Sequence, residues 1–183
     1  TLSATDVDGD TLTYTGSSPI GGTISTNDSI LTFSPPLNYN GEVNIDIVVN
    51  DGQLTDTGSF TLVVNPVNDV PILVTLDNAE TLEDESLTYG LSATDIDGDA
   101  LTYAASSSHG SVSITGSTLT VVPEDDYNGD IQIDVAVDDG ELTDTGSFTL
   151  TVNPVNDAPE LDIISDQSVD EDNTFSYQLS ASD

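Results

Sequence analysis

The chain repeats itself with a period of 88 or 89 residues. Residues 2–10 return almost unchanged as residues 91–99, and the same pattern starts a third time at residues 179–183. A second block, residues 54–69, recurs at residues 142–157. Solenoid repeats are shorter, at roughly 20 to 50 residues, whereas about 88 residues make a small domain. The sequence therefore predicts an array of similar domains, called modules below.

Two linkers bracketed by prolines set the expected module boundaries. Residues 65–71 and 153–159 each contain two prolines, which cannot continue a sheet ladder and favour a stiff, extended backbone. Since the chain starts and stops at the same point of the repeat, we expect a piece of a much longer polypeptide or the repeating unit of an assembly. The expected parts are a module without its first strands (1–66), a complete module (67–155) and the opening strands of a third (156–183).

Apolar and polar side chains alternate in the segments between turn signals. Residues 43–49 and 131–137 are apolar at every second position, as expected of strands with one buried face. Asp-Gly, Asn-Gly and Gly-Gly pairs separate such runs, and no window has the apolar period of a helix. About seven short strands per module predict an all-β fold of tandem immunoglobulin-like antiparallel sandwiches in a linear array. Further strands are expected at residues 12–14, 30–33, 59–64, 101–103, 119–122 and 147–152.

The charge of the chain is extreme and of one sign. There is no Lys or Arg against 34 acidic residues, which gives a formal net charge of −34. Nucleic acids and anionic lipid surfaces are excluded as direct partners, because no side chain could replace their counterions. An acidic chain can be disordered, but 36% of the residues are apolar and alternate regularly, which favours folding. Self-repulsion favours bound divalent cations, and without cysteine the ligands must be oxygens, which suit calcium.

Acidic and amide residues recur at three fixed positions of the module. An isolated Asp-Xaa-Asp-Gly segment is as readily a solvated turn as a metal site. Its two aspartates, however, point to the same side of an extended segment about 6.5–7 Å apart, where a cation can bridge them. Recurrence beside an Asn-Asp linker favours calcium, which takes about six to eight oxygens in loose geometry. The groups are Glu83 with its acidic neighbours, the pairs Asp6/Asp8 and Asp95/Asp97, and the linker pairs Asn68/Asp69 and Asn156/Asp157.

These motifs resemble the cadherin-like tandem repeats of large bacterial and archaeal surface adhesins. The likeness lies in an Asn-Asp linker followed by Pro71, in Glu83, and in an Ala-Xaa-Asp-Xaa-Asp segment before the Leu-Thr-Tyr of residues 101–103. In that family the Glu of one module, the linker, and the Asp-Xaa-Asp of the next module hold calcium together. The ligands implied by the resemblance are Asn68, Asp69, Asp95 and Asp97 at the first junction, Glu83, Asn156, Asp157 and Asp183 at the second, and Asp6 and Asp8 in the first module.

One part of the cadherin pattern is missing. Cadherins carry a Leu-Asp-Arg-Glu motif in mid-module, and other residues occupy that place here, which leaves Glu42 and Asp130 as weak substitutes for its Glu ligand. Tyr39 and Tyr127, in the same segments, are expected to pack at a corner. The remaining candidates are Asp10 and Asp99, which could close a local ion site in their loop, and Asp51 and Asp139, for which a turn role is favoured.

No residue pattern predicts catalysis. His109 is the only histidine, and the first module has Ile20 and Gly21 at the corresponding place, so a turn residue is favoured over a member of a catalytic triad. We therefore expect no enzyme but a calcium-rigidified extender region of a long extracellular adhesin or surface fibre. Its expected partners are neighbouring modules of the same chain and, through other regions, cell-surface or matrix ligands.

Two other functions stay open. Residues 156–183 could complete the truncated first module of another copy by strand addition, which would make the chain a subunit of a self-assembling filament. The third candidate is a carbohydrate-binding accessory module of a secreted enzyme. That function calls for a row of exposed aromatic side chains, and the chain has no Trp and only 5% aromatic residues.

Overall fold

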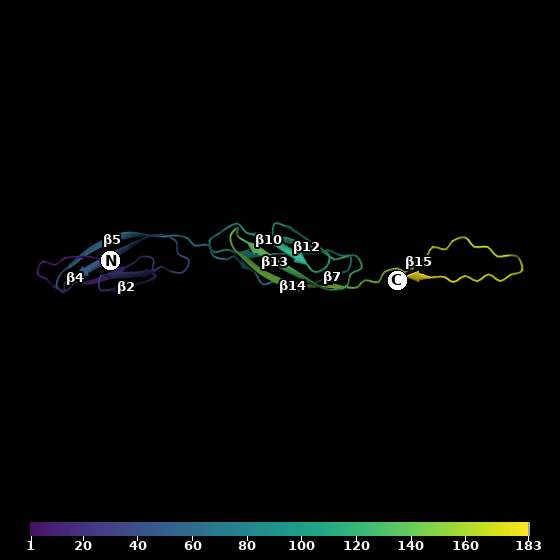
Figure 1. Cartoon of the computed structure of the whole chain (residues 1–183), viewed down its shortest axis with the longest axis horizontal. Coiled ribbons are helices and arrows are strands. Elements are labelled where there is room, and N and C mark those ends of the chain that lie inside the picture. The colour runs from purple at the N-terminus through teal and green to yellow at the C-terminus, as the bar shows by residue number, and fades with distance from the viewer. Residues whose placement is uncertain (183) are drawn as a thin grey trace. The chain divides into compact units, whose positions relative to one another are not determined.

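The computed structural model describes residues 1–182, which form strands, turns and extended segments. The strands gather in two compact units (Figure 1). Unit 1 comprises Thr1–Asp69 with Ile96–Gly98, and unit 2 comprises Val70–Asp95 with the described residues from Asp99 onward. No helix in residues 1–182 is long and apolar enough to cross a membrane. The predicted all-β fold class is confirmed, since every regular element of the described chain is a strand.

Unit 1 is built on a long antiparallel hairpin. β4 pairs with β5, and β1 adds to the other edge of β4, while β2 and β3 form a separate hairpin. Val43 and Ile45, at alternate positions of β4, are buried. The alternation of residues 43–49 thus marks a strand with one buried face. The strands are β1 (Thr13–Ser17), β2 (Thr23–Asn27), β3 (Ile30–Ser34), β4 (Gly41–Asn50) and β5 (Thr55–Val64).

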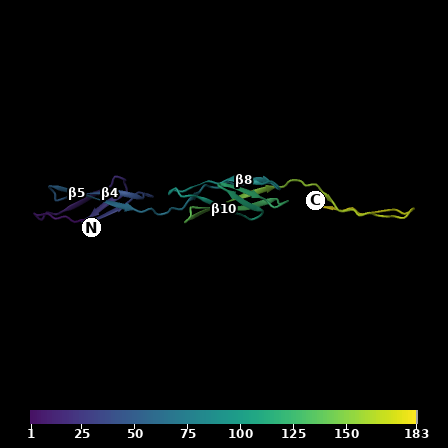
Figure 2. The ribbon, with the colours of Figure 1, turned by 90° about the horizontal axis from the view of Figure 1, so that it is seen from above.

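Unit 2 contains a sandwich of two sheets, with strand orders β10-β13-β14-β7 and β11-β12-β8. Leu119 and Val121 of β12 share one buried cluster with Ile131 and Ile133 of β13, so a single core joins the sheets. Figure 2 labels β8 and β10, which belong to different sheets. The strands are β7 (Ala79–Leu82), β8 (Leu87–Gly90), β10 (Thr102–Ser107), β11 (Ser111–Thr115), β12 (Thr118–Val122), β13 (Gly129–Asp138) and β14 (Thr143–Asn153).

The pairing of β7 with β14 departs from the antiparallel pattern that the sequence predicts. These two strands run parallel, with Leu150 opposite Ala79 and Asn153 opposite Leu82. The chain passes from one sheet to the other at residues 83–86, so β7 and β8 do not form a hairpin. β7 instead occupies the edge of β14 that β13 leaves open.

The long strands begin earlier than predicted. β5 begins at Thr55 and β14 at Thr143, four residues before the apolar alternation of each strand. The early part of each strand is rich in Thr, Asp and Gly. Backbone pairing with β4 and β13 continues there all the same, because ladder hydrogen bonds need no apolar side chain.

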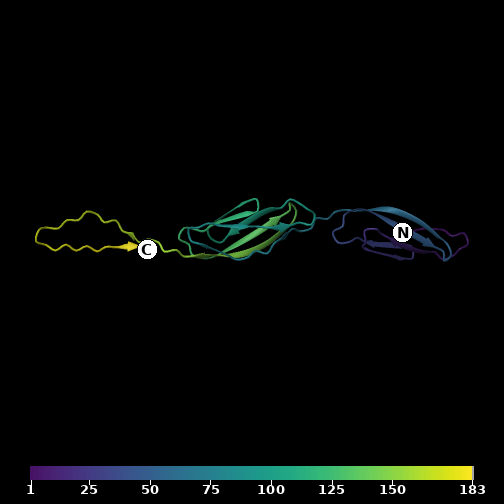
Figure 3. The ribbon, with the colours of Figure 1, turned by 180° about the vertical axis from the view of Figure 1, so that it is seen from behind.

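Two very short strand pairs repeat the same local structure at an offset of 88 residues. β6 (Ile72–Leu73) pairs with β9 (Ala93–Thr94), and β15 (Glu160–Leu161) pairs with β16 (Ala181–Ser182). Figure 3 shows the hairpin closed by β15 and β16 in yellow. The first pair flanks β13 and β14 of unit 2, whereas both residues of β15 and of β16 are exposed.

Candidate metal centre

Three exposed carboxylates from distant parts of unit 2 converge at one place. Asp84, Asp126 and Asp157 each bring a carboxylate oxygen within 4.8 Å of the other two. Asp84 follows β7, Asp126 lies in the turn before β13, and Asp157 belongs to the linker that follows β14. The tertiary structure therefore gathers residues that are 31 to 73 positions apart in the sequence.

Local backbone geometry aims two of these side chains. Asp84 and Asp126 both have positive φ, 64° and 57°, in the left-handed region that few residues other than Gly and Asn adopt. The Asp126 amide donates a 3.3 Å hydrogen bond to Asp84 Oδ1, which couples the two turns. Neighbouring Tyr127 donates its hydroxyl hydrogen to the Asp130 carbonyl oxygen, as Tyr39 does to Glu42, so both tyrosines hold their corners as predicted.

Glu83 fixes the start of the linker beside this cluster. Its side chain is only 4% exposed, and it accepts hydrogen bonds from the Val155 amide and from Asn128 Nδ2, the latter at 3.2 Å. The Glu83 amide donates in turn to the Asn153 carbonyl at 2.9 Å. A buried carboxylate needs such partners, since burial of an unpaired charge costs several kcal/mol or more. Glu83 therefore ties the β7–β8 turn to the chain that carries Asp157.

The electrostatics of the cluster favour a divalent cation. Two unit charges of like sign about 4 Å apart repel by about 1 kcal/mol in bulk water and about 4 kcal/mol at the effective dielectric near a protein surface. No Lys or Arg exists anywhere in the sequence to offset this repulsion. Three convergent carboxylates fit calcium, a hard cation that accepts oxygen ligands in variable geometry.

A second carboxylate cluster lies in the loop that follows β9. Asp95, Asp97 and Asp99 also bring oxygens within 4.8 Å of one another. Gly98, with φ of 82°, makes the tight turn, and the Asp99 amide donates to Asp95 Oδ1 at 3.2 Å. The Asp69 amide donates to Asp97 Oδ2 at 2.8 Å, and both of these residues belong to unit 1. Of the predicted set of Asn68, Asp69, Asp95 and Asp97, this hydrogen bond joins Asp69 to Asp97. The cluster groups Asp95 and Asp97 with the weaker candidate Asp99.

Family comparisons agree with this architecture. Residues 2–65 match the cadherin-like domain family, and residues 68–151 match the bacterial Ig domain family. The chain thus contains a cadherin-like domain and a bacterial immunoglobulin-like domain. Domains of these families are typically extracellular or surface-exposed and non-catalytic, and cadherin-like domains generally bind calcium.

Similar proteins include both enzymes and cadherins. Chitinase A of Pseudoalteromonas piscicida is 32% identical over 105 residues, which are 55% of this chain and 13% of the chitinase. The chain thus matches only a small part of that relative's length. Human protocadherin-24 EC1-2 covers 84% of this chain and 87% of its own at 17% identity and a TM-score of 0.57, a likeness of fold. An endo-fucoidan hydrolase of glycoside hydrolase family 107 covers 81% of this chain and 24% of its own at 21% identity, with a TM-score of 0.40.

Most other predicted ligands of these cadherin-like and Ig domains make local contacts. Asp6 Oδ1 accepts hydrogen bonds from the amides of Asp8 and Asp10 at 2.9 and 3.0 Å, and no cluster forms there in the described residues. Asn156 Nδ2 donates to the Asp157 carbonyl oxygen at 2.8 Å. Asn68 is half-buried. Asp183 lies outside the described residues.

The two weak substitutes for the missing Glu ligand do not reach the Asp84 cluster. Asp130 Oδ1 accepts the hydroxyl hydrogen of Thr151 at 2.8 Å, across the ladder of β13 and β14. Glu42 is exposed on β4. The carboxylate that does reach the cluster is Asp126, four residues before Asp130.

Asp51 and Asp139 close the turns between the long strands. Asp51 Oδ1 accepts hydrogen bonds from the amides of Gln53 and Leu54 at 2.7 and 2.6 Å, and Asp139 Oδ1 accepts the equivalent pair from Glu141 and Leu142. The Leu54 and Gln53 amides stabilise the ionised form of Asp51 and lower its pKa below the usual value. This is the turn role that the sequence favours.

Sequence reasoning missed Asp84 and Asp126 as members of a carboxylate cluster. Asp84 stands inside the acidic run that includes Glu83, and Asp126 occupies the place of the missing cadherin motif. The available signal was the alignment of the modules, in which Asn38 stands where Asp126 does, since Asn and Asp both favour turns. In the structure both residues have a φ of 57°. A position that adopts the left-handed conformation in both modules marks a turn whose side chain has a defined direction.

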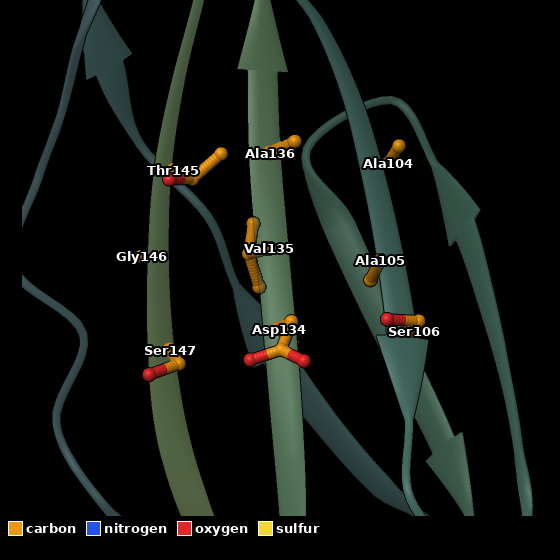
Figure 4. Close-up of a pocket in the computed structure, with 9 residues that line it drawn as sticks. All are labelled: Ala104, Ala105, Ser106, Asp134, Val135, Ala136, Thr145, Gly146 and Ser147. Atoms are coloured by element: carbon orange, nitrogen blue, oxygen red, sulfur yellow. The ribbon is translucent and has the colours of Figure 1, made fainter.

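A concavity lies on the β10-β13-β14 sheet and is lined by none of the clustered carboxylates. It encloses about 540 Å³. Figure 4 shows small side chains along it, with Asp134 as its one charged residue. No aromatic side chain lines it, so it offers no platform for stacking a sugar ring. Its lining residues are Ala104, Ala105, Ser106, Asp134, Val135, Ala136, Thr145, Gly146 and Ser147.

Proposed function

We propose that this chain is a calcium-stabilised spacer of a long extracellular protein, an adhesin or a surface fibre. One observation carries the proposal: the linker residue Asp157 meets Asp84 and Asp126 of the module that precedes it. An ion bound by these three carboxylates would connect the linker to the module at a second point, besides the hydrogen bonds of Glu83. A segment held at two points is stiffer than one held at a single point.

The proposed ion adds both stability and charge compensation. Extracellular calcium modules bind with dissociation constants of about 10⁻⁴ to 10⁻³ M. At a hundredfold excess of calcium over such a constant, a site that exists only in the folded state contributes roughly 2.7 kcal/mol. The Asp95, Asp97 and Asp99 loop would bind an ion by the same chemistry. A chain with 34 acidic residues and no basic ones gains from each ion it binds.

In this proposal the partners of each module are its neighbours. Two linker contacts support the proposal: Asp157 lies in the first cluster, and the Asp69 amide donates to Asp97 of the second. Adhesive targets on cells or in a matrix would be bound by other regions of the protein. Nucleic acids and anionic membranes are poor partners for a surface with no basic side chain.

Small-angle scattering and calorimetry test the proposal together. Removal of calcium with EDTA is expected to alter the scattering profile of residues 1–183 and to lower the melting temperature. Re-addition of calcium should restore both quantities, while magnesium, which demands tighter octahedral geometry, should restore them less. If the profile and the melting temperature are the same with EDTA and with calcium, the proposal is wrong.

A second candidate, an accessory domain of a carbohydrate-active enzyme, is favoured by the match to a chitinase. Depletion of the purified chain by insoluble chitin tests it. Binding would support a carbohydrate-binding module. If the chain stays in solution at every chitin concentration, the carbohydrate-binding function is excluded and the spacer role remains. A domain of an enzyme can also act as a spacer.

A further inference from the structure

The turn that leads into β13 contains an Asn-Gly pair, Asn128-Gly129. Both residues are exposed. In such a pair the glycine nitrogen reaches the side-chain carbonyl carbon of asparagine more easily than any other residue's nitrogen would, because glycine has no Cβ and the most flexible backbone. The sequence contains one other Asn-Gly pair, Asn40-Gly41, at the start of β4. The pair is therefore a repeated feature of the module.

The fold requires glycine at this position. Gly129 has a φ of 133°, a value that residues with a side chain rarely adopt. A Cβ placed on Gly129 would also lie 3.3 Å from Tyr127 Oη, the hydroxyl group that donates to the Asp130 carbonyl at 3.1 Å. Gly41 has a φ of 122° for the same position of its module. Glycine therefore cannot be replaced there without strain beside the tyrosine corner.

The fold also uses the asparagine, because its side chain is bonded to the buried Glu83. Asn128 Nδ2 donates to Glu83 Oε2 at 3.2 Å, while the other oxygen of Glu83 accepts from the Val155 amide. An amide can donate this hydrogen bond, whereas an ionised carboxylate can only accept one. Conversion of Asn128 to an acid would therefore replace an attraction by a repulsion beside a carboxylate that is 4% exposed.

We propose that Asn128 is a site of spontaneous deamidation, and that this modification weakens the anchor of the linker at Glu83. In the reaction the Gly129 nitrogen attacks Asn128 Cγ and forms a new C–N bond. The Cγ–Nδ2 bond breaks, and the side-chain nitrogen leaves as ammonia with the proton of the Gly129 amide. Water then opens the cyclic succinimide. Opening at one carbonyl gives aspartate, and opening at the other gives isoaspartate, in which the main chain runs through the former side chain.

Either product disturbs the contact with Glu83. Aspartate brings a second carboxylate to the place of the donor, and isoaspartate also lengthens the main chain just before β13. The linker residue that reports the change is Val155, whose amide donates to the same carboxylate. The inference goes beyond the proposed spacer function and does not depend on calcium. It describes a spacer whose linker loosens with the age of the protein.

Peptide mapping by mass spectrometry tests the modification in the folded chain. The chain is incubated at mildly alkaline pH, and an isoaspartyl methyltransferase identifies isoaspartate among the products. Asn78 is the internal control, because it is exposed and hydrogen-bonded in the same unit but is followed by Ala79. Asn128 is expected to convert roughly tenfold faster than Asn78, since alanine carries the Cβ that glycine lacks. Equal rates at the two residues would overturn the proposal, as would an Asn128 that does not convert.

Two variants test the consequence for the linker. Asn128→Asp reproduces one product from the start and is expected to lose the protection of the Val155 amide against hydrogen exchange. Asn128→Gln is the matched control, because its amide can still donate to Glu83 while its longer side chain disfavours ring closure. It should keep the protection throughout the incubation, whereas the parent should lose protection in step with conversion. Unchanged protection of Val155 in Asn128→Asp would contradict the weakened anchor.

The hydrogen bond to Glu83 should itself slow the reaction, because it restrains the amide group that has to leave. Glu83→Ala is therefore expected to speed the conversion of Asn128 several-fold and to leave Asn40, which belongs to unit 1, unchanged. An unchanged rate at Asn128 in this variant would contradict the role of the bond. Failure of the spacer proposal, by contrast, would appear as a melting temperature that EDTA does not lower, with the conversion rates unaffected.

Discussion

Units 1 and 2 contain nearly the same central hairpin but bury it to different extents. Ile45 and Ile133 are fully buried in both, because β4 and β13 lie in the middle of their sheets. Phe60 and Phe148 differ, because only β14 is covered by the stretch from β6 to β9. The central strand of each sheet is thus buried by residues of its own hairpin. The neighbouring strand is buried only where the stretch from β6 to β9 covers it.

The carboxylate clusters differ between the two units in the same way. Unit 2 has the acidic turn after β7, so its linker carboxylate meets Asp84 and Asp126. In unit 1, Asn38 stands in the place of Asp126, and no residue of the described chain corresponds to Asp84 before β1. The comparison teaches that the opening strands of a module supply both the cover of its core and part of its carboxylate cluster.

The largest difference is expected from alanine substitution of the paired phenylalanines. Phe148→Ala removes a buried ring that stacks on Tyr89 and should lower the free energy of unfolding of unit 2 by about 3–5 kcal/mol. Phe60→Ala removes a ring that is 42% exposed and should cost less than half as much. Chemical denaturation of the two variants measures both values, and equal losses would contradict the comparison.

The next largest difference is expected between valine substitutions of the equivalent glycines, Gly146 and Gly58. Gly146→Val places a side chain against Leu73 and is expected to destabilise unit 2 by about 1–3 kcal/mol through overpacking. Gly58→Val meets no atom and should be neutral or stabilise by about 0.5–1 kcal/mol, since glycine in a strand carries an entropic cost. Thermal melts of both variants in dilute solution give the signs. A destabilised Gly58→Val would show that the face of unit 1 is not open.

Loss of the linker anchor should have a smaller effect. Glu83→Ala leaves the Val155 amide and Asn128 without their buried acceptor, which should cost about 1 kcal/mol, with water replacing part of the loss. Glu80→Ala, an exposed neighbour on β7, is the control and should cost little. Amide hydrogen exchange at Val155 reports the anchor itself. Unchanged protection there in Glu83→Ala would exclude the anchoring role.

The smallest expected effect concerns pH. The pKa of Asp51 is lower in the folded state than in the unfolded state, so its contribution to stability is present above the unfolded pKa and is lost as pH falls through the folded pKa. Asp51→Asn should therefore be less stable than the parent at about pH 7, and the difference should shrink as the pH falls below the ordinary aspartate pKa of about 3.9. Melting temperatures of the two proteins across this range measure it. A difference that is constant with pH would mean that the charge of Asp51 plays no part.

The sequence was sufficient to predict where the strands lie, but not which strands pair with one another. The alternation of residues 131–137 predicts β13 because one face of that strand is buried and the other is solvated. The parallel pairing of β7 with β14 has no local signature, since it depends on where the chain crosses between sheets. The burial of Phe148 depends likewise on Tyr89, which lies far away in the sequence and which no local pattern of β14 reveals.

The carboxylate clusters likewise include one that the sequence predicts and one that it does not. Residues that are neighbours in sequence, such as Asp95 and Asp97, can be grouped from their spacing alone. Asp126 and Asp157 meet Asp84 only because two turns and a linker arrive at one end of the module. Asp130 was the plausible substitute for the missing Glu by position, but its side chain faces Thr151 in the sheet.

The melting temperature of Asp126→Asn with and without calcium tests the central claim most directly. Asparagine tolerates the positive φ of this position, as Asn38 does in unit 1, so the change removes charge without backbone strain. Asp125→Asn is the matched control, because it removes one charge from an exposed neighbour outside the cluster. In EDTA both variants should melt no lower than the parent.

In excess calcium, the parent and Asp125→Asn are expected to gain roughly 10–20 °C in unit 2, from a site contributing roughly 2.7 kcal/mol. Asp126→Asn should lose about half of that gain, since a tenfold weaker site contributes about 1.4 kcal/mol less. Equal gains in Asp126→Asn and Asp125→Asn, or no gain in the parent, would contradict the assignment of a calcium site to Asp84, Asp126 and Asp157.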